Sequence, residues 1–163
     1  MANIKINLNG LEIMVFFWNS LMSREKVSES FLNDLCSMQE FSYIYNEDFN
    51  NESLRRLLSA LNNKEPFSGN KPERKYYSNS LMIMEYIDEV QPAINAIKKL
   101  NLNSIAEKAK EDVEVVVVPG LSKGIEKTDN KLIVDFFGLK NTENGLVISG
   151  ESLEAVLKNM FEV

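Results

Sequence analysis

Four consecutive valines, Val115–Val118, are the feature that most constrains the fold of this chain. β-Branched side chains lose conformational freedom in a helix, whereas they pack well on the pleated surface of a sheet. The run stops at Pro119-Gly120, a pair that typically ends a regular element. We therefore predict a buried strand here, and the rest of the fold must supply its partner strands and its cover.

Two more strands and a helix are predicted after the valine run. In Lys131–Phe137 the residues alternate between two faces, which is the period of a strand. Gly145–Ser149 is a short third strand. After Ser149-Gly150, apolar residues recur at helical spacing as far as Phe161. The C-terminal part is thus expected to form a β-meander covered by an amphipathic helix.

The N-terminus is predicted to be a β-hairpin. Apolar residues at positions 4, 6 and 8 alternate with polar ones, and Asn9-Gly10 is a pair that readily adopts a tight turn. The alternation continues through Leu11 and Ile13 to about Val15, which would be the returning strand.

The middle of the chain is predicted to be helical. The first helix is expected to start at a Ser23 cap, and the second at Asn50 or Asn51 with a buried face of leucines. Residues 62–75 hold two prolines and a glycine, so we expect a surface loop there. Beyond it we predict a helix from about Leu81, a kink or a new helix at Pro92, and a small helix over 104–111.

The strands at the two ends of the chain are expected to meet, because an isolated hairpin is only marginally stable in water. Joining the hairpin to the meander gives a sheet of about five strands, and the short connections favour antiparallel pairing. We therefore predict the α+β class, with a mainly antiparallel sheet covered by the central helices and the C-terminal helix. The sequence shows no second core, so residues 1–163 are expected to form a single globular domain.

The absence of histidine is the strongest functional statement in the sequence. It removes the Ser-His-Asp and Cys-His arrangements, and with one cysteine it also argues against structural zinc. Cys36 lies near the end of a predicted helix, where the dipole does not activate a thiol, so it is expected to be a packing residue. We predict no enzyme, no catalytic or metal-binding residues and no cofactor.

The formal net charge of −6 argues against a protein that holds a phosphate backbone and favours a basic partner. Six basic residues between Arg55 and Lys75 precede Tyr76-Tyr77, a pattern that nucleic-acid contacts use, but a solvated loop explains it better. The longest apolar run, Ile13–Trp18, is too short to span a bilayer, and the first residues do not resemble a signal peptide. We therefore expect a cytoplasmic protein without nucleic-acid or membrane contacts.

Two acidic groups are the candidate partner-binding residues. The first lies in the aromatic and acidic segment 39–49, which could instead be a covered strand: Glu40, Tyr43, Tyr45, Glu47, Asp48 and Phe49. The second group, expected at positions i, i+3 and i+4 of one helix, consists of Glu85, Asp88 and Glu89. A solvated helical face is the simpler interpretation of that second group, and a Mg²⁺ or Ca²⁺ site is the alternative.

A small acidic chain of this composition is similar in general character to the immunity proteins and antitoxins that neutralise bacterial toxin domains, although no motif carries the similarity. The leading hypothesis is therefore a bacterial toxin inhibitor that binds a basic protein, such as a nuclease domain. A histidine-free enzyme or ligand-binding protein that uses carboxylates is one alternative. A homo-oligomeric structural or assembly subunit, associating through apolar surface near Phe16–Trp18, is the other.

Overall fold

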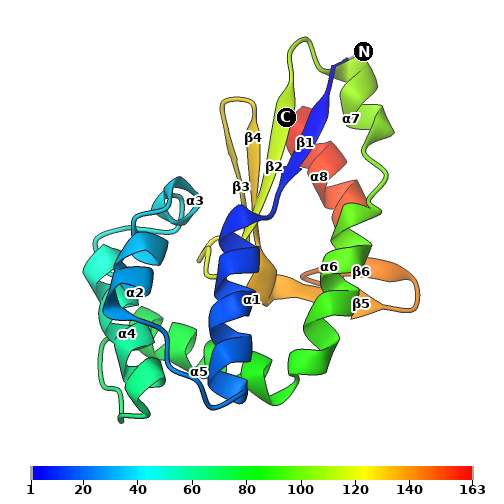
Figure 1. The fold of residues 1–163 in the computed structure, drawn as a ribbon. Helices are drawn as coiled ribbons and strands as arrows, with labels where there is room; N and C mark the ends of the chain where they lie inside the picture. Colours follow the sequence, from blue (N-terminus) through cyan, green and yellow to red (C-terminus); the bar gives the residue numbers. More distant parts are fainter. Residues whose placement is uncertain (1, 163) are drawn as a thin grey trace. The chain divides into compact units, whose positions relative to one another are not determined.

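The computed structural model describes residues 2–162 and places them in two compact units. The sheet unit comprises Met1–Leu8 and Asp88–Val163, and the helical unit comprises Asn9–Ile87. The chain begins the sheet unit with its first strand, forms the whole helical unit, and then returns to complete the sheet unit (Figure 1). The α+β class is confirmed, while the prediction of a single domain over residues 1–163 stays a prediction.

The main sheet of the sheet unit is mixed. Its strand order is β1-β2-β4-β3, in which β1 and β4 both pair in parallel with β2, and β3 pairs antiparallel with β4. The valine strand is central, and Val115–Val118 have no exposed surface, as the sequence predicts. The strands are β1 (Ile4–Asn7), β2 (Val113–Val118), β3 (Ile125–Thr128) and β4 (Lys131–Asp135).

A second, antiparallel sheet follows the first in the chain. It has the order β5-β6-β7 and is packed against helices of the same unit, α6 on β5 and β6 and α8 on β6 and β7. Leu153 and Leu157 form the buried face of α8, which confirms the predicted C-terminal helix. The remaining elements of this unit are η1 (Ile87–Glu89, which starts at the unit boundary), α6 (Val90–Lys98), α7 (Asn103–Lys108), η2 (Phe136–Gly138), β5 (Leu139–Thr142), β6 (Gly145–Ile148), β7 (Glu151–Ser152) and α8 (Leu153–Glu162).

The helical unit consists of helices that bury one face each. Helix α1 packs on α2, α3 and α5, and α4 packs on α2 and α5. Trp18 and Phe17 of α1 are fully buried, and the leucine face predicted for α4 is confirmed. The helices are α1 (Asn9–Met22), α2 (Glu29–Cys36), α3 (Gln39–Ser42), α4 (Asn51–Asn63) and α5 (Lys71–Glu85).

The predicted N-terminal hairpin is wrong. Asn9-Gly10 begins α1 instead of forming a turn, because Leu11, Met14 and Trp18 recur at helical spacing and form one buried face. The prediction of a mainly antiparallel five-stranded sheet is matched only in part, because the main sheet is mixed and the antiparallel strands β5, β6 and β7 form a second sheet. The connection from β1 to β2 is long and helical, and this allows the two strands to pair in parallel.

The central helices are shifted from their predicted limits. The cap of α2 is Ser28, whose hydroxyl accepts a hydrogen bond from the Phe31 N–H at 3.0 Å, and not Ser23. Asn50 caps α4 as predicted. The loop expected over 62–75 is shorter, because α4 runs to Asn63 and Asn70 already caps α5.

Candidate partner-binding surface

The charges of the helical unit are separated along its sequence. Between Lys26 and Arg55 the chain has no lysine or arginine. The structure distributes the carboxylates of this stretch over α2, α3, the following turn and the first turn of α4. We call the six together the acidic surface: Glu29, Asp34, Glu40, Glu47, Asp48 and Glu52.

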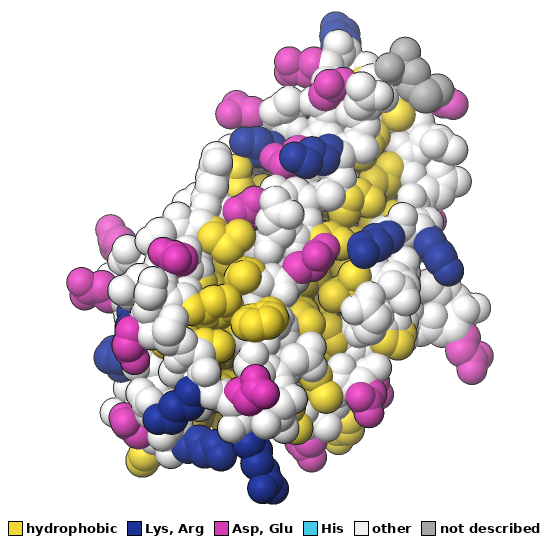
Figure 2. All heavy atoms as spheres, in the orientation of Figure 1, with side chains coloured by type: hydrophobic (Ala, Val, Ile, Leu, Met, Phe, Trp, Pro, Cys, Tyr) yellow, Lys and Arg dark blue, Asp and Glu magenta, His cyan; other side chains and the backbone are white. Residues whose placement is uncertain are grey.

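Most of these carboxylates are available to a partner. Asp34, Glu52 and the pair Glu47 and Asp48 are exposed, and within residues 2–162 none of these four forms an ion pair. Glu29 is different, because it pairs with Arg55 of α4. Figure 2 shows several acidic side chains along the left edge of the drawn face, with basic side chains among them, where Figure 1 places α2 and α4.

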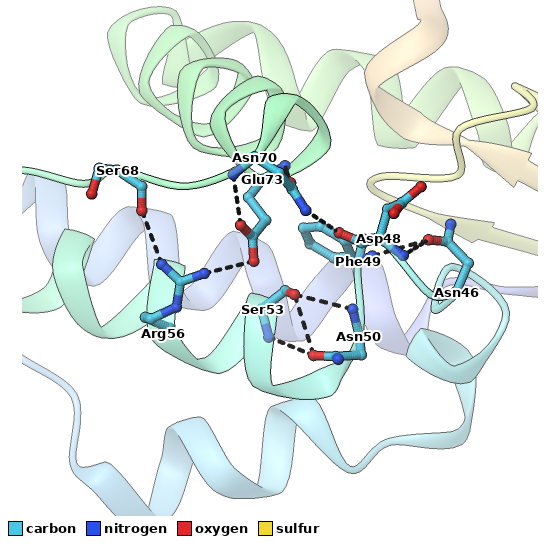
Figure 3. Close-up of polar contacts among 9 residues, drawn as sticks. All are labelled: Asn46, Asp48, Phe49, Asn50, Ser53, Arg56, Ser68, Asn70 and Glu73. Atoms are coloured by element: carbon cyan, nitrogen blue, oxygen red, sulfur yellow. Dashed lines mark hydrogen bonds and ion pairs between the residues drawn. The ribbon is translucent and has the colours of Figure 1, made fainter.

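A hydrogen-bonded turn fixes the position of Glu47 and Asp48. The Asn46 side-chain oxygen accepts hydrogen bonds from the backbone N–H of Asp48 and of Phe49, at 2.8 and 2.9 Å. The Phe49 ring is buried and stacks on Tyr76, with 5.1 Å between the ring centroids. The buried Phe49 ring therefore anchors the turn, whereas Glu47 and Asp48 are exposed. Figure 3 shows Asp48 beside Asn46 and Phe49 in this turn.

A second set of contacts ties this turn to the start of α5. The Asn70 side chain donates to the backbone oxygen of Asp48 at 2.7 Å, and its own oxygen accepts from the Glu73 N–H at 2.9 Å. The Glu73 carboxylate in turn accepts a hydrogen bond from the Asn70 N–H, and it accepts another from the Arg56 guanidinium of α4 at 2.6 Å (Figure 3). The network joins the turn, α4 and α5.

Glu73 is only 6% exposed, so its charge depends on these partners. Burial by itself would raise the pKa of its carboxyl, but hydrogen bonds from Asn70, Ser53 and Arg56 hold that pKa below its ordinary value. The carboxylate is therefore ionised at neutral pH. It acts as a structural link and is not poised as a general acid.

The aromatic residues of the predicted segment are mostly structural. Residues 39–49 form α3 and a turn, and not the covered strand considered from the sequence. Phe49 belongs to the core, while Tyr45 is half-buried and donates its hydroxyl to the Cys36 backbone oxygen at 2.8 Å. Burial raises the pKa of the Tyr45 hydroxyl, and the nearby Cys36 raises it further. Glu40 of α3 and Tyr43, which ends it, are half-buried, and the exposed pair Glu47 and Asp48 follows them in the chain.

The second predicted group does not share one helical face. Glu85 is the last residue of α5, whereas Asp88 and Glu89 lie in η1. The helix is broken at Tyr86, whose backbone is not helical, and a continuous helix would bring the Pro92 ring against the Asp88 carbonyl. All three carboxylates are exposed, but they are divided between α5 and η1.

Two of the six residues of the basic stretch, Arg55 and Arg56, are used in contacts within the unit. Arg55 contacts Glu29 and Asn33, and Arg56 contacts Glu73 and the Ser68 backbone oxygen. The Arg56 guanidinium also lies 5.0 Å from the centre of the Phe67 ring. Together with the 64–70 loop, these side chains line an open cleft of about 550 Å³.

Sequence reasoning missed the network around Asn70 and Glu73. The signal for it was present, because a capping residue followed three positions later by glutamate marks a helix start. Recognising it would have ended the predicted loop at Asn70 and placed Glu73 at the first turn of α5.

Among the residues that the structure describes, no group of three or more cysteine, aspartate or glutamate side chains is arranged to hold a metal ion. In the same part of the chain, no helix combines the length and the apolar character required to cross a membrane. Comparison of the chain with protein family models, with curated proteins and with solved structures finds no match.

Proposed function

We propose that this chain is a bacterial, cytoplasmic protein-binding protein of the immunity or antitoxin kind, which binds a basic toxin domain and neutralises it. The observation that carries the proposal is the acidic surface, whose carboxylates come from a stretch of 28 residues between Lys26 and Arg55 that contains no lysine or arginine. Of its six carboxylates, Glu29 is paired with Arg55. The contact residues of the acidic surface are expected to include the exposed pair Glu47 and Asp48, with Tyr43 and Glu40 beside them.

Electrostatics supports a basic protein as the partner. A group of exposed carboxylates attracts a cationic surface at a distance and mainly raises the rate of association. Their effect is screened over about 8 Å at physiological ionic strength, so binding should weaken as salt is added. The half-buried Tyr43 adds an aromatic contact of the kind that often dominates interface energy.

The rigidity of the turn also supports the proposal. Glu47 and Asp48 are held by Asn46 and, through the Asp48 backbone, by Asn70. A surface that is already ordered loses little conformational entropy when a partner binds. The energy of contact is therefore available for affinity.

The test is affinity capture from the source cells with three tagged forms of the full chain. These are the wild type, the Glu47→Lys/Asp48→Lys variant and the Glu107→Lys/Glu111→Lys variant, which makes the same charge change at exposed positions of the sheet unit. Captured proteins are washed at low and then at high salt and identified by mass.

The proposal expects one stoichiometric basic protein with the wild type and with the Glu107→Lys/Glu111→Lys control. The Glu47→Lys/Asp48→Lys variant should lose at least tenfold in affinity for it, and high salt should weaken the wild-type complex. Equal capture by all three forms would remove the acidic surface from the interface. Absence of any basic partner at low salt would refute the proposed function.

A further inference from the structure

The helical unit has a second surface feature that the acidic surface does not include. An open cleft of about 410 Å³ lies between the end of α1, the end of α4, the following loop and α5. Its apolar lining consists of Leu21, Leu61, Pro66, Tyr77, Leu81 and Met84. We call it the apolar cleft.

One lining residue of the apolar cleft is a large exposed apolar side chain, and two more exposed apolar residues are chain neighbours of the lining. Leu81 of the lining is 46% exposed, and its chain neighbour Met82 is 61% exposed. On α1, Met22 follows the lining residue Leu21 and is 49% exposed. Exposed apolar groups that gather around a cleft are a recurrent sign of a protein contact, and methionine adapts readily to the shape of a partner.

The charges at the rim indicate which partner fits. Lys64 and Glu65 are the only charged residues that line the apolar cleft, and within residues 2–162 neither forms an ion pair. Lys64 ends α4 in the left-handed conformation, with φ of 55°, and Glu65 follows it directly in the chain. A rim with one charge of each sign suits neither a uniformly basic nor a uniformly acidic partner.

Such a rim is complementary to itself. When two copies meet about a two-fold axis, the same patch is used twice, so Lys64 of one copy can face Glu65 of the other. We propose that the apolar cleft is a homodimer interface, in which Leu81 and Met82 of α5 from each copy cover the cleft of the other. The acidic surface shares no residue with the apolar cleft, so the proposal does not depend on the proposed function.

The experiment is sedimentation equilibrium of the full chain over concentrations up to about 300 µM, a range in which weak protein interfaces are populated. The wild type is compared with Leu81→Asp/Met82→Asp, which places carboxylates in the apolar contact. Phe16→Asp is the matched control, because Phe16 of α1 is 56% exposed but does not line the apolar cleft.

Charge variants provide a readout that does not depend on the apolar substitutions. Lys64→Glu and Glu65→Lys each leave a rim of one sign, so each should weaken dimerisation at least tenfold. The double exchange Lys64→Glu/Glu65→Lys restores a self-complementary rim and should recover most of that loss.

The proposal expects a monomer–dimer equilibrium for the wild type and for Phe16→Asp, and a monomer for Leu81→Asp/Met82→Asp. A wild type that remains monomeric at every concentration would overturn it. Dimerisation that survives both the apolar and the single charge substitutions would also overturn it, because the interface would then lie elsewhere.

Discussion

Glu73 provides the sharpest test of how the helical unit is held together. Its carboxylate accepts one hydrogen bond from the Asn70 N–H at 2.9 Å and one from Arg56 at 2.6 Å. Replacing it by alanine removes both contacts and leaves a cationic group and a helix-start N–H without this partner. Replacing it by glutamine keeps an acceptor for the Asn70 N–H but removes the negative charge.

The magnitude follows from these two contacts. Loss of a capping contact typically costs about 1 kcal/mol. A hydrogen bond to a charged group contributes about 1.5–3 kcal/mol. Because the Arg56 side chain is 53% exposed, solvent screens that bond and the low end of the range applies. We expect Glu73→Ala to lower the free energy of unfolding by about 2.5 kcal/mol, and Glu73→Gln by about 1.5 kcal/mol.

Urea unfolding followed by tryptophan fluorescence measures these changes, because Trp18 is the single tryptophan of the chain and is fully buried in the helical unit. Glu85→Ala is the control, since Glu85 lies on the same helix, is exposed, and should change stability by less than about 0.5 kcal/mol. Equal losses for Glu73→Ala and Glu85→Ala would refute the structural role of the network. A loss for Glu73→Gln as large as that for Glu73→Ala would refute the separate contribution of capping.

Three further predictions concern buried groups of the same unit. The folded state lowers the pKa of Glu73 from its ordinary value of 4.5, so the contribution of its charge to stability should be complete above that pH and disappear as the pH falls through the lower folded pKa. The stability difference between wild type and Glu73→Gln, measured by urea unfolding, should therefore shrink below about pH 4.5. A difference that stays constant down to pH 3, about 1.5 units lower, would contradict this. Burial raises the pKa of the Cys36 thiol to about 11 despite the nearby Arg55. A thiol reagent at neutral pH should therefore label Cys36 only after unfolding. Prompt labelling of the native protein would contradict this prediction. The Ser80 hydroxyl is fully buried without a hydrogen-bond partner in the described part of the chain, so Ser80→Ala should be neutral or stabilise the protein by up to about 1 kcal/mol. Ser53→Ala removes part of the α4 cap and should cost about 1 kcal/mol. Thermal or urea unfolding compares the two variants, and a larger loss for Ser80→Ala would be inconsistent with the structure.

Elements with strong local signals could be predicted from the sequence. The Val115–Val118 strand has a β-branched composition and a sharp end at Pro119-Gly120, and the structure places it at the centre of the main sheet. Helix α4 has an asparagine cap and four leucines at helical spacing on its buried face, and both features are confirmed. In these cases local preference and burial favour the same structure.

Elements whose signals conflict could not be predicted in the same way. Asn9-Gly10 has the preference of a hairpin turn, but the apolar residues that follow it need one helical face to be buried. Tertiary packing decided between the two. The parallel pairing of β1 with β2 depends on a connection of more than a hundred residues, and no local pattern describes such a contact.

In the candidate site, too, features with a local cause could be predicted from the sequence, and features that depend on distant residues could not. The exposure of Glu47 and Asp48 follows from their charge, and it agrees with the sequence expectation. The burial of Phe49 depends on Tyr76, which is 27 positions further along the chain, so spacing within segment 39–49 could not reveal it. The sequence does contain a signal for the break at Tyr86 that separates Glu85 from Asp88. That signal is Pro92, which is tolerated near the start of a helix and not in its interior, so a new helix must begin shortly before it.

The most direct test of the proposed function is rescue of growth. The basic protein captured by the wild-type chain is expressed in a bacterial host together with the wild type, with Glu47→Lys/Asp48→Lys, or with the Glu107→Lys/Glu111→Lys control. We expect the captured protein alone to stop growth, the wild type and the control to restore it, and the Glu47→Lys/Asp48→Lys variant to fail although it is folded and equally abundant. Rescue by all three forms alike, or a captured protein that does not impair growth, would contradict the proposal that this chain neutralises a toxin through its acidic surface.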